Sequence, residues 1–205
     1  VTTKRGAAGK PQIQISSEIG ISNIPKRYDL MNPYEYAQAL ETMTDTRFSA
    51  ADMEAYKNGT KGVDYQDLML QTGISQDYKL SISGGSKKNK YMISGLFLNQ
   101  TGITAESKLK RFGFRANLDS QVTPWLNIVT NVEGSTENTH NTGADLFVMA
   151  NYSPAMDLTD ANGVYLRDPY CSISTNPYGS LVANDSDGEN YNVKGFIDFR
   201  FSKRD

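Results

Sequence analysis

The chain has 205 residues, enough for one or two ordinary domains, and a formal net charge of -2. Basic residues are not in excess over acidic ones, so no nucleic-acid partner is expected. No run of about eighteen apolar residues occurs, which excludes a transmembrane helix but leaves open a barrel of alternating strands.

The chain contains one cysteine and one histidine. Cys171 has no partner for an internal disulfide or a thiolate metal cluster, and we interpret it as a small buried hydrophobe. A Ser–His–Asp arrangement with His140 is formally possible but disfavoured, because no serine lies in a nucleophile elbow. The sequence therefore predicts a protein that is not an enzyme and holds no cofactor.

The first strand is expected at residues 11–22, where isoleucines alternate with polar residues. A long insertion, residues 23–73, follows it. Asn32 and Pro33 are expected to start a helix that runs to Met43. Further helix is expected in this insertion at Ala50–Lys57, where Ser49 is the cap and Asp52 occupies the position of a capping-box acid, and at residues 63–72.

Strands then follow one another closely, separated by a tight turn at residues 84–89 and a polar connection at residues 101–108. Trp125 opens the last strand of this group, and residues 135–190 are expected to form a long irregular loop rich in Asn, Asp, Gly, Pro and Tyr. The remaining strands are expected at residues 74–83, 90–100, 109–120 and 191–201, of which 90–100 carries bulky side chains on both faces.

Most of these strands have one apolar and one polar face, so the sheet separates two unlike media. In a soluble sandwich the media are a core and water, whereas in an outer-membrane barrel they are lipid and a wet lumen. The alternation of short and very long connections is typical of such a barrel. We therefore predict a mainly β fold, with antiparallel up-and-down strands forming about six strands of a larger transmembrane β-barrel and short helices in its long loops. A soluble sandwich with two large insertions is the alternative.

The residues expected to face lipid share the apolar side of their strands. They are Ile13, Ile19, Leu80, Ile82, Phe112, Phe114, Ile197 and Phe199. Aromatic residues near strand ends are interpreted either as an interfacial girdle or as ordinary sheet packing, and these are Tyr78, Tyr91, Trp125 and Tyr191.

Several segments of the chain are distinctive as motifs. Residues 80–102 run from Leu-Ser-Ile-Ser-Gly-Gly-Ser-Lys to Phe97, Asn99, Gln100 and Gly102. The others are Val-Thr-Thr-Lys-Arg-Gly at residues 1–6, residues 25–37, Gly-Val-Asp-Tyr-Gln-Asp at 62–67, Arg-Ala-Asn-Leu-Asp at 115–119 and Asp-Ala-Asn-Gly-Val-Tyr at 160–165. In this order the segments resemble those of the SusC/RagA family of TonB-dependent transporters, and residues 80–102 are the most specific match.

The resemblance implies a barrel of about 22 strands with a plugged lumen, of which this chain supplies the first six. Residues 1–10 would then be the end of the plug domain and a linker, and residues 11–205 the N-terminal part of the barrel, with long loops 23–73 and 135–190. It further implies import of oligosaccharides or peptides across the bacterial outer membrane. The implied partners are outer-membrane lipid, a SusD-like surface lipoprotein, and the TonB complex acting through N-terminal parts absent here.

Two loop features carry further hypotheses. Loop tyrosines and polar residues could meet a sugar or the partner lipoprotein, or the tyrosines could pack the loops internally. These candidates are Asn151, Tyr152, Asp157, Asn162, Tyr165, Asp168, Tyr170 and Tyr178. The segments 160–163 and 185–189 fail as EF-hand loops, because Leu158 and Ala183 occupy the first ligand position, while an irregular calcium site in these loops is left open.

The second hypothesis for the whole chain is a soluble β-rich carbohydrate-binding module that uses the same tyrosines. In that case the apolar faces would meet a second sheet. The abrupt ends of the chain, without a signal sequence or a closing element, suggest a piece excised from a longer protein. Because six strands are too few to close a barrel, the isolated piece is expected to associate through its edges or its apolar face.

Overall fold

The computed structural model describes residues 6–141, 143, 145–169, 175–183 and 186–201. Its strands are β1 (Gly9–Ser22), β2 (Gly73–Gly85), β3 (Asn89–Thr101), β4 (Lys108–Thr123), β5 (Leu126–Asn141) and β6 (Ser186–Phe201). Its helices are α1 (Pro33–Met43), α2 (Ala50–Lys57), α3 (Tyr65–Met69), α4 (Leu146–Asn151) and α5 (Pro177–Ala183). The described helices include none that is long and apolar enough to cross a membrane.

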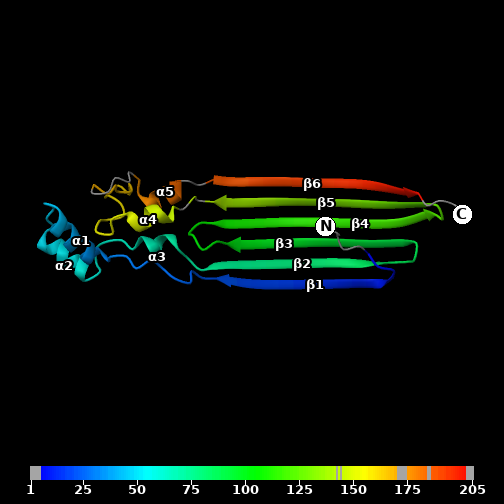
Figure 1. Ribbon diagram of the computed structural model, residues 1–205, viewed down its shortest axis with the longest axis horizontal. Coiled ribbons are helices and arrows are strands. Elements are labelled where there is room, and N and C mark those ends of the chain that lie inside the picture. The colour runs from blue at the N-terminus through cyan, green and yellow to red at the C-terminus, as the bar shows by residue number, and fades with distance from the viewer. Residues whose placement is uncertain (1–5, 142, 144, 170–174, 184–185, 202–205) are drawn as a thin grey trace.

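The strands form one six-stranded antiparallel sheet in the order β1-β2-β3-β4-β5-β6, so each strand pairs with its neighbours in sequence. Tight connections join β2 to β3 and β4 to β5 at one end of the sheet, which we call the turn end. The helices gather beyond the opposite end, which we call the loop end (Figure 1). This is the up-and-down arrangement, with loops sorted by side, that the sequence predicts.

The helices of the first insertion begin where the sequence places their caps. Asn32 Oδ1 accepts a hydrogen bond from Glu35 N at 2.9 Å, and Glu35 Oε2 accepts one from Asn32 N at 3.0 Å. This reciprocal pair, with Pro33 in the first turn, fixes the start of α1. Ser49 caps α2 through the backbone of Asp52, whose carboxylate bonds the serine hydroxyl rather than reaching back to its backbone.

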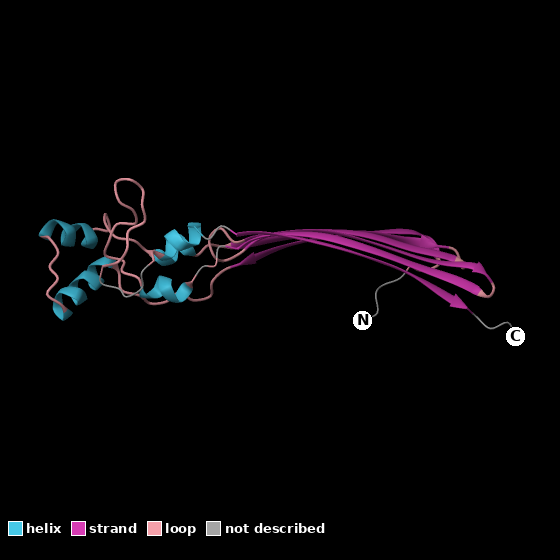
Figure 2. Ribbon diagram, turned by 90° about the horizontal axis from the view of Figure 1, so that it is seen from above, coloured by secondary structure: helices cyan, strands magenta, loops and turns pink. Residues whose placement is uncertain are grey.

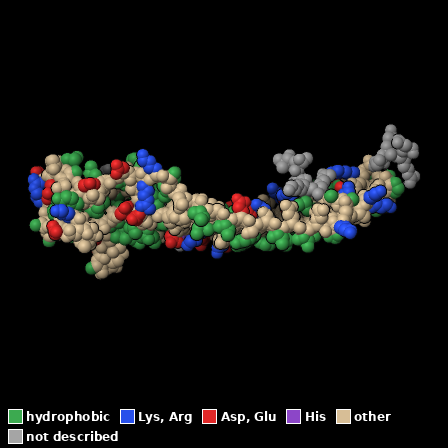
Figure 3. Space-filling model, turned by 90° about the horizontal axis from the view of Figure 1, so that it is seen from below, with side chains coloured by type: hydrophobic (Ala, Val, Ile, Leu, Met, Phe, Trp, Pro, Cys, Tyr) green, Lys and Arg blue, Asp and Glu red, His purple; other side chains and the backbone are tan. Residues whose placement is uncertain are grey.

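The sheet is curved along its strands, with the loop unit at one end (Figure 2). Apolar side chains cover its convex face, while charged groups lie mainly on its concave face and beyond the loop end (Figure 3). Strand register explains this separation, since Ile13 pairs with Ile82, Ile82 with Ile93, and Ile93 with Ala116. Residues paired in this way share a face, so most apolar residues of the six strands lie on one side, although Met92 and Leu96 of β3 line the concave face.

The buried hydrophobic core of the described residues lies in the loops rather than against the sheet. We call residues 23–72 and 142–185, as far as they are described, the loop unit. One cluster in it contains Tyr65, Met69, Met149, Tyr152 and Leu181 with Val63, and a second contains Ala37, Tyr56 and Ala155. Across the described part of the chain no second sheet covers either face of the first.

Several boundaries differ from the prediction, and the differences at α3, β5 and β6 matter most here. Helix α3 spans Tyr65–Met69 only, because Leu70 already pairs with Thr104 in a short β-bridge. Strand β5 continues to Asn141 and β6 begins at Ser186, so the second loop is shorter than predicted and contains α4 and α5. The added strand residues are polar on both faces and therefore show no alternation to mark them as strand.

Candidate functional site: the two faces of the sheet and the loop unit

The eight residues predicted to face lipid all lie on the convex face. Seven of them are 45 to 67% exposed, from Phe114 at the low end to Ile13 at the high end, and Ile82 is half-buried. None of the described strands or helices packs over them. Large apolar side chains exposed together over a whole sheet are rare on soluble monomers and mark a surface that contacts another apolar phase.

Aromatic residues form a row across the convex face near its loop end. Tyr78 pairs with Phe97, Phe97 with Phe112, and Phe112 and Tyr191 both pair with Thr136. The rings of Tyr78 and Phe97 stack with their centroids 6.4 Å apart. At the turn end, the ring of Trp125 stacks on that of Phe201 at 6.3 Å.

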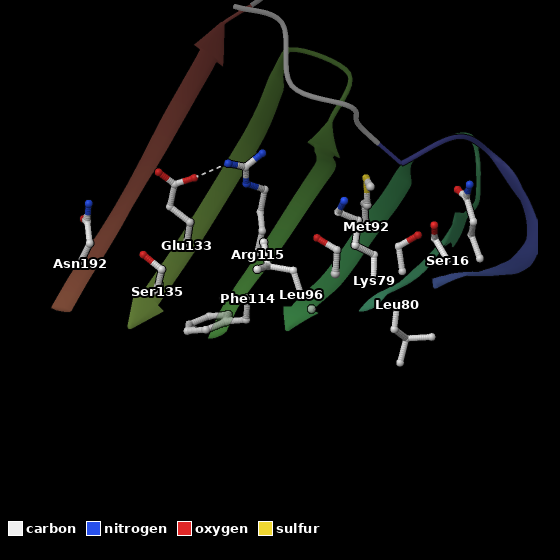
Figure 4. Close-up of a pocket in the computed structure, with 16 residues that line it drawn as sticks. Ser16, Lys79, Leu80, Met92, Leu96, Phe114, Arg115, Glu133, Ser135 and Asn192 are labelled. Atoms are coloured by element: carbon white, nitrogen blue, oxygen red, sulfur yellow. Dashed lines mark hydrogen bonds and ion pairs between the residues drawn. The ribbon is translucent and has the colours of Figure 1, made fainter. Parts of the chain in front are cut away.

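The concave face carries most charges of the sheet, and two of its ion pairs join the neighbouring strands β4 and β5. Arg115 Nη2 lies 2.7 Å from Glu133 Oε2, and Arg111 forms an ion pair with Glu137 four residues away along each strand. Arg115 and Glu133 line a shallow groove of about 530 Å³ together with small residues such as Gly113 and Ser94. In Figure 4 Arg115, Glu133 and Ser135 point into the groove, whereas Phe114 and Leu80 point to the opposite side of the ribbon. Adjacent residues of one strand, such as Phe114 and Arg115, thus lie on faces of opposite character.

The two long loops are joined into one body by contacts between residues about a hundred positions apart. Tyr56 Oη donates a hydrogen bond to the carbonyl of Ala155 at 2.9 Å, and Val63 N donates one to the carbonyl of Pro154 at 2.9 Å. The rings of Tyr65 and Tyr152 meet edge to face at 5.3 Å. These contacts are buried, so the loops stabilise each other rather than standing as separate flexible segments.

Asn176 is the central buried polar group of the loop unit. Its Oδ1 accepts hydrogen bonds from Tyr178 N and Gly179 N, which caps α5, and its Nδ2 donates to Tyr65 Oη at 3.2 Å and to the carbonyl of Leu166 at 3.1 Å. Sequence reasoning missed this residue, although Asn176-Pro177 repeats the cap-and-proline signal of Asn32-Pro33.

An ion pair at the surface connects the same two loops. Lys61 Nζ lies 2.8 Å from Asp52 Oδ1 and 3.8 Å from Asp157 Oδ2. The hydrogen bond from Lys61, with a second one from Ser49, lowers the pKa of Asp52 below its usual value. Inside the unit, burial raises the pKa of the Tyr65 hydroxyl well above its usual value, so that hydroxyl stays neutral.

The structure places the candidate loop residues in different environments. Tyr152 and Asp168 are buried, and Tyr152 Oη accepts from Asp168 N at 2.8 Å and donates to the carbonyl of Leu166. Tyr165 and Tyr178 are half-buried and meet edge to face at 6.0 Å. Asn151, Asp157 and Asn162 are exposed. Tyr170 and Cys171 lie outside the described residues.

Two further predictions concern single segments. Asp160 Oδ1 accepts hydrogen bonds from Asn162 N and Val164 N, each at 2.8 Å, so its carboxylate closes a turn. Among the residues that the structure describes, no group of three or more His, Cys, Asp or Glu side chains is arranged to hold a metal ion. His140 lies at the loop end of β5, with Nδ1 3.0 Å from Asp187 Oδ1.

No family model matches the chain. It is 29% identical over 189 residues to TonB-dependent receptor P3 of Formosa agariphila, covering 87% of this chain and 18% of that protein. It is 31% identical over 119 residues to TonB-dependent receptor SusC of Bacteroides thetaiotaomicron, covering 58% of this chain and 11% of that protein. The chain thus spans less than a fifth of the length of either relative.

Solved structures agree on the fold. The RagAB peptide importer in its open-open state aligns with a TM-score of 0.67 at 20% identity, covering 98% of this chain and 27% of that one. The same importer in its closed-closed state aligns with a TM-score of 0.66 over 95% of this chain.

Proposed function

We propose that this chain, which belongs to the SusC/RagA family of TonB-dependent receptors, forms part of the wall and two surface loops of an importer in the bacterial outer membrane. In this role the convex face meets lipid and the concave face lines the lumen. The chain contributes no catalytic group, and its task is to separate the two media and to present the loop unit at the cell surface.

The observation that carries this proposal is the opposite character of neighbouring side chains on one uncovered sheet. Leu80 is 48% exposed on the convex face, while Ser81 lies in the groove on the concave face. A soluble carbohydrate-binding module, the other function considered, would need a second layer over the convex face. The described residues provide no such layer, which favours the importer.

The cargo we propose is an oligosaccharide or a peptide. RagAB, whose fold this chain shares, is a peptide importer. Polar groups on the loop unit suit either cargo, because Asn151, Asp157 and Asn162 offer amide and carboxylate groups at its surface. We also propose that a SusD-like lipoprotein binds over the loop unit and that TonB supplies energy through parts of the protein that precede residue 1.

Transport in living cells tests this function. Deletion of the gene is expected to abolish uptake of one labelled cargo from a panel of oligosaccharides and peptides, and the intact protein is expected to fractionate with the outer membrane. Restoring the gene should restore uptake. A protein recovered in the soluble fraction, with uptake of every cargo unchanged by the deletion, would contradict the proposal.

A further inference from the structure

The turn end of the sheet carries a cluster of lysines. The connection between β2 and β3 contains Lys87 and Lys88, both exposed, and the half-buried Lys90 follows in β3. Among the described residues none of the three takes part in an ion pair, whereas Arg200 at the same end is bonded to Asp198. Three ammonium groups therefore lie in one short segment with no carboxylate bonded to them.

Hydrogen bonds fix the backbone of this turn. Ser86 Oγ accepts hydrogen bonds from Lys88 N at 3.2 Å and from Asn89 N at 3.0 Å. The carbonyl of Lys88 accepts a further one from Gln121 N of β4 at 2.8 Å. Because the turn is tied both to itself and to β4, little backbone order has to be gained when its lysines meet a ligand.

The three lysines line a hollow of about 390 Å³, which we call the turn-end hollow. Its lining also includes Pro124 and Trp125 from the connection between β4 and β5, and Arg200 and Phe201 from β6. Asp119 is the one acidic residue among the described residues that line it. The lining side chains thus carry an excess of positive charge, so the ligand that complements them is an anion.

The turn-end hollow borders the apolar convex face. Trp125 and Phe201, whose rings stack 6.3 Å apart, are 38% and 71% exposed. Arg200 precedes Phe201 in β6, so these two side chains point to opposite faces, and the hollow lies at the strand ends rather than on one face. Indole rings concentrate where hydrocarbon gives way to the headgroups of a bilayer. The basic groups lie beside such a ring.

We propose that the turn-end hollow binds the phosphate of an anionic phospholipid in the leaflet at the turn end. The proposal rests on the proposed function, which puts the convex face in the bilayer and the short connections on the periplasmic side. The acyl chains then lie along the convex face beside Trp125 and Phe201, and the phosphate lies among the ammonium groups of Lys87, Lys88 and Lys90. A zwitterionic headgroup suits the site less well, because the lysines repel its own cation.

Two features favour a lipid over a soluble phosphate. The stacked pair of Trp125 and Phe201 offers apolar surface that acyl chains contact and a free ion does not. Lys87 and Lys88 are exposed, so a free ion would bind weakly there, whereas lipid of the adjoining bilayer is present at a high local concentration. Clusters of lysines at a membrane surface attract anionic lipids for the same reason.

Native mass spectrometry of the intact protein tests the proposal. The protein would be held in mixed micelles that contain equal amounts of phosphatidylglycerol and phosphatidylcholine with the same acyl chains. We expect it to retain phosphatidylglycerol in preference. The triple variant Lys87→Gln, Lys88→Gln and Lys90→Gln should retain this lipid about tenfold less or weaker still, because each lysine near a membrane surface contributes about fivefold to the binding of anionic lipid. Retention of phosphatidylcholine should not change.

Two matched variants serve as controls. Lys26→Gln, Lys57→Gln and Lys110→Gln together remove the same charge from exposed positions away from the turn end and should keep the preference. Replacement of the three turn-end lysines by arginine keeps the charge and should also keep it. All three variants are expected to insert into phospholipid vesicles as the unchanged protein does, because none of the replaced side chains is buried.

Equal retention of the two lipids by the unchanged protein, or an equal loss in the two glutamine variants, would overturn the site and leave the lipid-facing role of the convex face intact. Displacement of phosphatidylglycerol by millimolar inorganic phosphate would also overturn it, and would assign the hollow to a soluble anion. Failure of the unchanged protein to insert into vesicles would instead overturn the proposed function, so the two failures are distinguishable.

Discussion

The ring of Phe114 on β4 lies directly over Gly134, its paired residue on β5. A Cβ added to Gly134 would come within 2.5 Å of Phe114 Cε1, closer than carbon atoms approach. Because Gly134 has no side chain, the ring of Phe114 can lie over it on the convex face. There the ring covers the backbone of Gly134. This contact packs an aromatic side chain of β4 against the backbone of β5 on the convex face.

Replacement of this glycine should therefore cost more than replacement of a glycine with free space. Gly134→Ala is expected to lower the free energy of unfolding by about 1 to 2 kcal/mol more than Gly195→Ala. At Gly195 an added Cβ would lie 3.7 Å from its nearest neighbour, an ordinary contact, on the same face of the sheet. Urea unfolding of the intact protein in lipid vesicles measures both, and equal costs would argue against the packing role of Phe114.

The two faces of the sheet should respond differently to charge. Leu80→Arg places a cation on the convex face and is expected to reduce folding stability in a bilayer by about 2 to 4 kcal/mol. Ser81→Arg, one residue along β2, points into the concave groove and should change stability by less than about 0.5 kcal/mol. The amount of folded protein inserted into vesicles measures both effects. A larger loss for Ser81→Arg would reverse the assignment of the faces.

Asn176 should control the integrity of the loop unit. Asn176→Ala removes the cap of α5 and the bonds to Tyr65 and Leu166, so we expect a local loss of about 2 kcal/mol or more. Hydrogen exchange of the backbone amides at residues 153–168 is the readout. The exposed Asn162→Ala is the control, and similar exchange in the two variants would count against a central role for Asn176.

Alkaline pH should open the loop unit through Tyr65. Burial raises the pKa of its hydroxyl in the folded protein, so that above about pH 10 the unfolded state loses a proton that the folded state keeps. The stability contributed by this neutral group is complete below about pH 10 and falls as the pH rises further. The loss of loop-unit stability at alkaline pH, measured by hydrogen exchange, should be smaller in Tyr65→Phe than in the unchanged protein. An unchanged pH dependence in that variant would assign the effect to another group.

The sequence predicts the sheet well because a sheet with one apolar and one polar face imposes a period of two on each strand. Ile13, Phe112 and Phe199 could be assigned to one face from alternation alone, and the alternation of short and long connections predicted the up-and-down order. The alternation rule failed at residues 137–141 and 186–190, where both faces of the strands are polar and the period disappears. The ends of β5 and β6 were therefore predicted too short.

The loop unit could be predicted only in part. Caps at Asn32 and Ser49 are local signals, and both helices begin where those signals place them. The contacts that bury Tyr152 and Asp168 include residues far away in the sequence, such as Tyr65. No rule of sequence spacing predicts that these residues meet. Aromatic and polar residues in a loop look alike whether they pack inward or face a ligand, so their roles required the three-dimensional arrangement.

The account depends on contact between the convex face and acyl chains, and photo-crosslinking measures that contact directly. A photoreactive benzoylphenylalanine would replace Phe114 or, as the matched control, Ser135, which points to the other side of the sheet (Figure 4). After irradiation of cells, the account predicts lipid adducts at position 114 and none at position 135. Protein adducts without lipid at position 114 would contradict it.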